Sequence, residues 1–347
     1  MIVAERTQSR QPMANFIIEF FWFNDILGSV LGVILSSLLI FAVFQRRDGK
    51  TKQLHPYSRM VLVMAVNDFF FCFVEVNVQH ILAFGNYKMF VNAHGTEYHF
   101  LSSREHPYSF MVHVFFLMNT ITLLPAVYSY RYELMKNPAA AESWSPLLRR
   151  VFISCALSFI CATCGWLAVH RALQNGHEYY LQFLPDAWID EHNHTNFVYP
   201  VDVENPEGVS WVAALVIESA LCIVGAVYYA AKAYALVNHK SHFTSARTKS
   251  MQTQFTRSII AQTLTVILMA NMPAGAVLFC ICFGFKSNYV GTLILWPFSW
   301  VSAVASLLTF YFIRDYRRWL FNKFGYEGEK STYQSSNISN ITKTSLH

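Results

Sequence analysis

Four polar residues within one apolar stretch have the spacing of a single helix face. Asp68, Cys72, Glu75 and Gln79 follow one another at intervals of four, three and four residues. Because an α-helix has about 3.6 residues per turn, this spacing places the four side chains in one stripe. Carboxyl and amide groups between apolar neighbours are suited either to bind a ligand or to hydrogen-bond a neighbouring helix.

Other apolar stretches carry further candidates for a ligand pocket. His113 and Arg131 are eighteen residues apart, which is about five helical turns and places them on one face. Arg131 ends its stretch, where it stands between two tyrosines. A buried carboxyl group has the alternative role of bonding a neighbouring helix, and a tryptophan that of an interfacial anchor. The predicted pocket residues are Glu75, Gln79, His113, Leu117, Glu218, Trp296 and Trp300.

The composition indicates which elements carry these residues. Hydrophobic residues make up 54% of the chain and charged residues only 14%, whereas a soluble domain has roughly 25% charged residues. A window of about twenty apolar residues is long enough to cross a bilayer core. We therefore predict an all-α membrane protein, a seven-transmembrane helix bundle. Its spans are expected at 20–44, 58–84, 108–130, 149–170, 209–236, 256–284 and 290–313.

Two prolines and the segments outside the spans complete the predicted organisation. Pro125 and Pro273 lie inside spans and are expected to kink them, because each removes a helical hydrogen bond. With Asp68 they are the predicted structural or switch residues. The predicted segments are an extracellular amino-terminal segment (1–19), the bundle (20–313), an interfacial amphipathic helix (314–325) and a disordered cytoplasmic tail (326–347).

The distribution of lysine and arginine predicts the orientation. With seven spans, one side of the membrane holds twenty of these residues and the other holds six. The positive-inside rule then places the amino terminus outside the cell and the carboxyl terminus in the cytoplasm. The net charge of +5 lies mainly in loops beside anionic lipid, so membrane lipids are expected partners and nucleic acid is not. Asn193 begins a glycosylation sequon in the long outer loop.

The sequence does not indicate an enzyme. It contains no nucleophile and base pair, no metal-ligand set and no phosphate-binding glycine loop at useful spacing. All seven cysteines lie inside predicted spans, so the Cys161 and Cys164 pair is interpreted as packing rather than a redox or zinc site. We expect no cofactor and no metal.

Several stretches of this sequence resemble the nematode serpentine chemoreceptors of the Str superfamily, most closely the Srd and Str groups. Pro125 followed by Tyr130-Arg131-Tyr132 is similar to the family's signature at the inner end of the third helix. The other matching stretches are LHPYSRMVLVMAVNDFFF, FGNYKMFVNAHG, MQTQFTRSIIAQTLTVILMANMP and FYFIRDYRRW. The last helix departs from rhodopsin-like receptors because it has no Asn-Pro pair.

The resemblance implies a G-protein-coupled receptor in the plasma membrane of sensory cells or their cilia, detecting an environmental chemical. A small ligand would bind between the outer halves of the helices and expose the inner face to a heterotrimeric G protein. The alternatives are a ligand-gated channel or transporter, and a non-signalling membrane scaffold. The ligand, the G-protein class and the oligomeric state stay open. The residues expected to couple to the G protein are Tyr130, Arg131, Tyr132, Arg247, Lys249 and Arg257.

Overall fold

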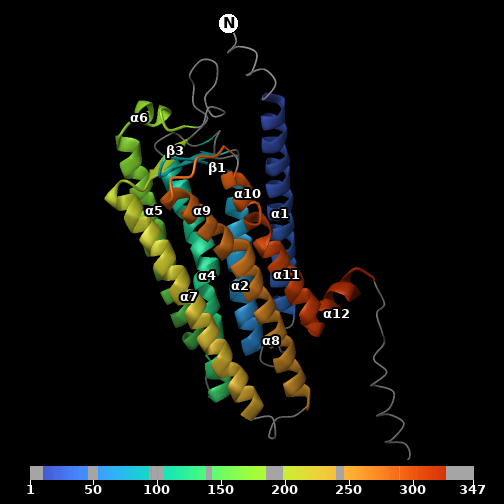
Figure 1. Ribbon diagram of the computed structural model, residues 1–347. Coiled ribbons are helices and arrows are strands. Elements are labelled where there is room, and N and C mark those ends of the chain that lie inside the picture. Colours follow the sequence, from blue (N-terminus) through green and yellow to red (C-terminus); the bar gives the residue numbers. More distant parts are fainter. Residues whose placement is uncertain are drawn as a thin grey trace, which may run out of the picture.

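The computed structural model describes residues 11–45, 54–93, 95, 100, 105–137, 143–184, 198–239, 246–288 and 290–325. Seven helical spans in this part are long and apolar enough to cross a membrane (Figure 1). The predicted seven-helix bundle is therefore confirmed. The first five spans belong to α1 (Gln11–Gln45), α2 (Pro56–Val78), α4 (His106–Lys136), α5 (Ser145–Gln174) and α7 (Pro206–His239).

The last two spans are each built from several pieces. The sixth joins α8 (Ala246–Val266), the π turn η4 (Ile267–Asn271) and α9 (Met272–Cys282). The seventh joins α10 (Val290–Leu295), the short 3₁₀ helix η5 (Phe298–Trp300) and α11 (Val301–Phe312). Two further helices, α6 (His177–Leu181) and α12 (Arg314–Lys323), lie outside the spans.

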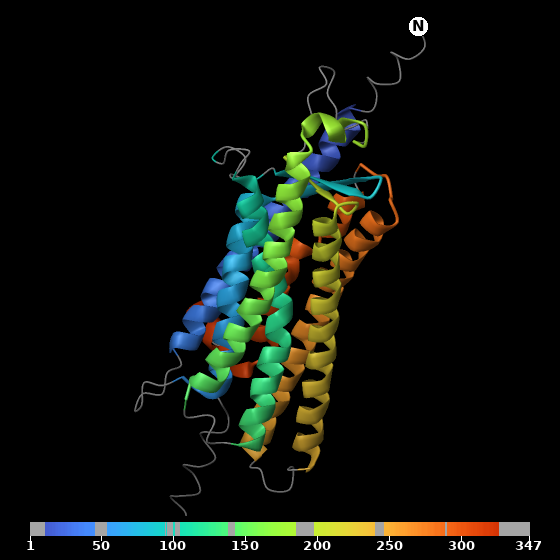
Figure 2. The same ribbon diagram turned by 90° about the vertical axis from the view of Figure 1, so that its left-hand side faces the viewer.

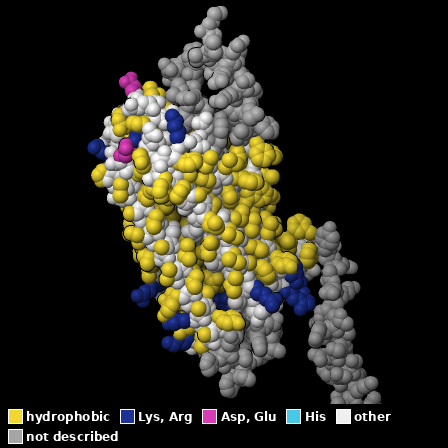
Figure 3. Space-filling model, viewed as in Figure 1, with side chains coloured by type: hydrophobic (Ala, Val, Ile, Leu, Met, Phe, Trp, Pro, Cys, Tyr) yellow, Lys and Arg dark blue, Asp and Glu magenta, His cyan; other side chains and the backbone are white. Residues whose placement is uncertain are grey.

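The surface of the bundle is that of a multi-pass membrane protein. Hydrophobic side chains cover the middle of the face in Figure 3, whereas lysine and arginine lie toward its ends. Large apolar residues on the helix exteriors are strongly exposed, among them Phe152 at 75% and Leu221 at 67%. A monomer in water rarely exposes so much contiguous apolar surface, and a bilayer would cover it. The polar residues of the spans turn inward instead, as Asp68, Cys72 and Glu75 do.

A small antiparallel sheet covers one end of the bundle. It consists of β1 (His80–Gly85), β2 (Lys88–Ala93) and β3 (Tyr199–Asp202) in the order β1-β2-β3. Figures 1 and 2 both show this sheet lying across the helix ends. We call the sheet the cap, the end of the bundle beneath it the cap end, and the opposite end the base.

The cap corrects the predicted second span, which was too long. The span was expected over 58–84, but α2 ends at Val78, and Gln79 caps it in the left-handed conformation with φ 46°. The following residues form β1, whose six positions are all buried. A short apolar run that is buried on both faces has no alternation to distinguish it from helix, so hydropathy extended the span through it.

The hairpin between β1 and β2 turns tightly. Asn86 and Tyr87 both have positive φ, at 46° and 62°, between the paired residues Gly85 and Lys88. Two positive φ values in a two-residue loop are the mark of a type I′ turn, whose twist matches that of the flanking strands. Asparagine suits the first position because its side chain tolerates the left-handed region.

The two span prolines have different surroundings. Helix α4 continues on both sides of Pro125, and Gly225 of α7 leaves room for the ring, because a Cβ there would lie 3.2 Å from the Pro125 Cβ. At Pro273, the helix changes to the π turn over the five residues immediately before Met272. The wider turn accommodates the lost hydrogen bond, and such turns are frequent at functional sites.

Helix α12 leaves the bundle sideways at its base (Figure 1). The side chains of Tyr316 and Trp319 hold it there, through hydrogen bonds to Ser58 (3.1 Å) and Gln45 (2.8 Å). These contacts fix α12 against α1 and α2. Its position at the membrane interface stays a prediction, and the predicted tail from residue 326 lies outside the described residues.

Candidate functional site

A chain of four buried side chains joins the bundle to the cap. Glu75 of α2 pairs with His113 of α4, with 2.6 Å between Oε2 and Nε2. The His113 Nδ1 lies 2.9 Å from the Nδ1 of His80 in β1. The other nitrogen of His80, Nε2, lies 2.5 Å from the hydroxyl of Tyr199 in β3. The structure thus brings two predicted pocket residues into direct contact and adds two that were not predicted.

Helix α1 approaches the same region. Asp25 interacts electrostatically with Glu75 and hydrogen-bonds Ser299 in η5. At the next residue of the seventh span, the indole nitrogen of Trp300 donates to Asn24 Oδ1 at 3.0 Å. The predicted pocket residue Trp300 therefore ties the seventh helix to the first. Trp296 is 44% exposed, which leaves much of its ring on the surface.

The other predicted pocket residues have separate positions. Gln79 is buried beside the end of α2, and Leu117 packs against the main core from α4. Glu218 of α7 hydrogen-bonds Cys161 of α5. Neither of these helices contributes a residue to the four-residue chain. Among the described side-chain contacts, Glu75 and His113 are the predicted pocket residues that pair with one another.

A second polar network crosses the middle of the bundle. Asn67 of α2 donates to Thr120 at 2.9 Å and accepts from Asn119 at 2.8 Å. The Asn119 side chain also accepts from Ser154 of α5 at 3.0 Å. Three helices are connected in this way through buried hydrogen bonds. In an apolar surrounding, such bonds hold helices together because no water competes for the polar groups.

Thr122 lies at the α4–α5 contact of this network and provides a stability prediction. Its hydroxyl lies 2.6 Å from the Ser154 hydroxyl and 2.9 Å from that of Ser158. We expect Thr122→Val to lower the free energy of unfolding by about 1 kcal/mol, the usual scale for such a bond between membrane helices. Thr163→Val is the matched control, because the Thr163 hydroxyl is bonded only within its own helix among the described contacts. Unfolding of the purified variants measures both, and equal stability of the two would contradict the role of Thr122.

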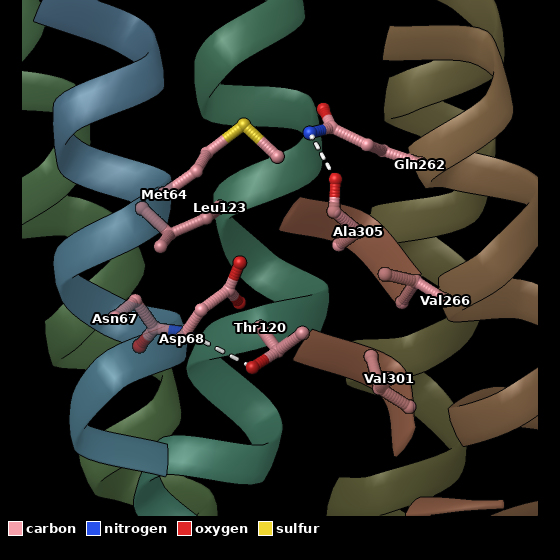
Figure 4. Close-up of a pocket in the computed structure, with 9 residues that line it drawn as sticks. All are labelled: Met64, Asn67, Asp68, Thr120, Leu123, Gln262, Val266, Val301 and Ala305. Atoms are coloured by element: carbon pink, nitrogen blue, oxygen red, sulfur yellow. Dashed lines mark hydrogen bonds between the residues drawn. The ribbon is translucent and has the colours of Figure 1, made fainter. Parts of the chain in front are cut away.

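A small cavity lies beside the middle network. It has a volume of about 10 Å³, which is close to the space that one water needs. Figure 4 shows Asp68 reaching into the space between α2, α4 and the seventh helix. Asp68 lies close to Ser302 of α11, so the predicted switch residue faces the seventh span from the second. The cavity walls also include Met64, Asn67, Thr120, Leu123, Gln262, Val266, Val301 and Ala305.

At the base, Arg131 is buried and links α4 to α8. Only 1% of the residue is exposed, and its guanidinium donates to the hydroxyl of Thr256. Two nearby contacts reinforce the same face of α8. The hydroxyl oxygens of Tyr128 and Thr263 are 3.0 Å apart. The ring of Tyr57 stacks on that of Phe255, with 4.8 Å between the ring centroids. A permanent cation is therefore held inside a closed base.

The other residues predicted to couple to a G protein differ in exposure. Tyr130 is fully buried, Tyr132 is half-buried against Tyr229, and Arg257 is exposed. The side chains of Arg247 and Lys249 and the sequon residue Asn193 lie outside the described part of the chain.

Arg59 is a buried cation of the base that the sequence analysis missed. Its guanidinium donates to the carbonyls of Leu54 (3.1 Å) and Ser143 (2.8 Å) and lies over the ring of Trp144. It therefore fixes the segment after α4 against the start of α2. A charged residue at the start of a predicted span is common at interfaces, so the sequence offered no signal that this one is buried.

The cap is held by a buried lysine. Lys88 of β2 lies 3.6 Å from Asp202 and 2.5 Å from Glu204, and the Lys88 and Asp202 side chains are 0% and 2% exposed. Burial raises the pKa of Tyr180, so its hydroxyl stays protonated and donates to Asp202 at 3.4 Å. All seven cysteines lie within the described residues and are free. This ion-pair cluster therefore holds β2 to the residues of β3 without a disulfide.

The described residues form a seven-helix membrane protein with a rhodopsin-like fold. Squid rhodopsin has a similar structure, with a TM-score of 0.61 and 12% sequence identity over 91% of this chain and 89% of that one. The family model "Serpentine type 7TM GPCR chemoreceptor Str" matches residues 23–321. The chain belongs to this family, as the sequence resemblance implied. No curated protein sequence matches it.

Proposed function

We propose that this protein is a chemosensory receptor that binds a small environmental chemical at the cap end and signals to a heterotrimeric G protein at the base. The observation that carries the proposal is the burial of Arg131 against Thr256. A cation enclosed between two helices becomes available to a partner only when those helices separate. The base therefore has the properties of a closed contact surface that a change in helix packing would open.

Connections inside the bundle supply a route between the two ends. Glu75 and His113 join α2 to α4 near the cap, and Asn67, Asn119 and Ser154 join α2, α4 and α5 in the middle. A ligand that binds one arrangement of these contacts better than another shifts the population toward it. Arg131 lies on α4, one of the two helices that both networks share. Binding at the cap end is thereby expected to move the helix that carries the base cation.

The proposed orientation places the cap outside the cell and the base in the cytoplasm. It follows the excess of lysine and arginine in the base loops. We place the protein in the plasma membrane of sensory cells or their cilia, in line with its family. The chemistry at the cap end, with Glu75, Asp25 and His113, favours a ligand that carries hydrogen-bond donors.

The test applies a broad panel of volatile and water-soluble compounds to cells that express the chain, while calcium and cyclic nucleotides are recorded. We expect at least one compound to evoke a response that requires the protein. A Glu75→Gln variant with normal surface expression should show an altered concentration dependence for that compound.

Two outcomes would overturn the proposal. One is a silent panel in cells whose surface expression of the chain is verified. The other is a ligand-dependent current across a bilayer that holds the purified protein alone, because a channel or transporter needs no G protein. A silent panel would favour the channel or scaffold alternative, and a current would favour the channel or transporter.

A further inference from the structure

The four-residue chain at the cap end has a geometry that constrains its protons. Glu75, His113, His80 and Tyr199 are 6%, 6%, 5% and 0% exposed, so the contacts within the chain are shielded from water. The three successive distances are 2.6, 2.9 and 2.5 Å. The Glu75–His113 contact is an ion pair by distance. The two contacts of His80 are hydrogen bonds, so each of them needs one donor and one acceptor. The middle contact joins two Nδ1 atoms, so one histidine must donate there and the other must accept.

One proton arrangement satisfies the whole chain with both histidines neutral. An ionised Glu75 carboxylate only accepts, so the proton of His113 is on Nε2. The Nδ1 of His113 then accepts from the Nδ1–H of His80. Since His80 is neutral, its Nε2 accepts from the hydroxyl of Tyr199.

A second arrangement satisfies the same contacts with one additional proton. His113 then carries protons on both nitrogens and donates to Glu75 and to His80. His80 stays neutral in its other tautomer, accepting at Nδ1 and donating from Nε2 to the Tyr199 oxygen. Both arrangements use the same positions of the heavy atoms. The chain can therefore gain or lose a proton without being rebuilt.

We propose that this chain is a proton-binding site, which makes acid a second ligand of the protein. The Tyr199 oxygen is buried, so it receives a proton from solvent when local opening of the cap admits water, while the tyrosine's own proton passes to Nε2 of His80. The proton on Nδ1 of His80 passes to Nδ1 of His113. The net change is one proton gained and a charge of +1 on His113, beside the Glu75 carboxylate. This proposal rests on the cap-end geometry and does not depend on the receptor role.

The surrounding charges explain why the proton is stored on one histidine and only passes through the other. Burial, together with the nearby His113 and His106, holds the pKa of His80 well below its usual value. His113 is the histidine that faces the Glu75 carboxylate, and Asp25 interacts with the same carboxylate. The titratable groups around the site are Asp25 on α1, Cys72 and Glu75 on α2, His80 on β1, His106 and His113 on α4, and Tyr199 on β3.

Proton uptake has a consequence for the connection between the cap and the bundle. The Glu75–His113 contact changes from a carboxylate with a neutral imidazole to a buried ion pair. Hydrogen bonds between ionised groups are roughly twice as strong as neutral ones. Acid on the cap side is therefore expected to tighten the link from β1 and β3 through α4 to α2.

The test follows histidine protonation by NMR in the purified full chain, isotopically labelled at histidine and held in lipid nanodiscs without ligand or G protein. Between about pH 8 and about pH 5, the range in which histidine titrates, the exposed histidines are protonated, and the signal of the buried His113 should also change from neutral to doubly protonated imidazole. His113→Asn should remove that signal. Glu75→Gln should weaken proton binding at least about tenfold, because the counter-charge is lost. His170→Asn removes the signal of an exposed histidine of α5 and should leave the titration of the His113 signal unchanged.

Infrared difference spectra over the same range, recorded on the unmodified protein and on Glu75→Gln, test which group takes up the proton. We expect a histidine to be protonated with no carboxylic acid band from Glu75. Because the bundle holds other buried carboxyl groups, such as Asp68, only a carboxylic acid band that Glu75→Gln removes is assigned to Glu75. Such a band would overturn the proposal, as would a His113 signal that does not change with pH. Because neither measurement involves a ligand or a G protein, failure here leaves the receptor proposal untouched.

Discussion

Exchange of Arg131 for alanine is expected to reduce ligand-driven signalling by about thirtyfold or more. This corresponds to the loss of about 2 kcal/mol, the scale for truncating an arginine anchor in an interface. The physical reason is that alanine offers neither the charge nor the donors that an opened base would present to a partner. Calcium and cyclic-nucleotide recordings, with a compound that activates the unmodified chain, measure the effect.

Two controls separate lost coupling from lost folding. Surface labelling should find Arg131→Ala at the level of the unmodified protein. Arg171→Ala removes an exposed arginine near the cap end, which bonds Gln174 of the same helix, and should keep full signalling. Normal signalling by Arg131→Ala would exclude the proposed role of this residue.

Exchange of Lys88 for methionine should destabilise the cap by about 3 kcal/mol. Removing one partner of a buried ion pair leaves the other charge buried without compensation, which costs about 3 to 5 kcal/mol. The lower end applies because Asp202 also accepts hydrogen bonds from Tyr180 and from the backbone N–H of Glu204. Unfolding of the purified protein measures the loss.

The controls for Lys88 are a neighbouring lysine and a double variant. Lys286→Met removes an exposed lysine from the same end of the bundle and should change stability by less than about 0.5 kcal/mol. Lys88→Met combined with Asp202→Asn removes both charges and should recover part of the loss. An equal effect of Lys88→Met and Lys286→Met would show that the buried ion pairs do not hold the cap.

Hydropathy and helical spacing were sufficient to predict the bundle from the sequence. Spans are long, and each must satisfy its backbone hydrogen bonds internally, so an apolar window identifies a helix. The same reasoning placed Asp68, Cys72 and Glu75 on one inward face, and all three are buried. It also placed Arg131 at the inner end of its span, although it could not show that the guanidinium is enclosed.

The cap was beyond such reasoning because its contacts are distant in the sequence. Lys88 pairs with Asp202, which is more than a hundred residues away. No local sequence pattern in either segment predicts that the two pair. The strand β1 has the apolar composition of a helix end. For the same reason His80 and Tyr199 were missed as partners of His113. Only the Asn86 turn offered a local signal for the hairpin, and asparagine followed by tyrosine is weaker than asparagine followed by glycine.

The most direct test of the receptor proposal is nucleotide exchange on a heterotrimeric G protein, driven by the purified chain in lipid nanodiscs. A compound that activates cells should accelerate GTP uptake with the unmodified chain, and Arg131→Ala should bring uptake back to the rate of the G protein alone. Acceleration that persists in Arg131→Ala, or no acceleration with any active compound, would contradict the proposal that the buried base cation couples ligand binding to a G protein.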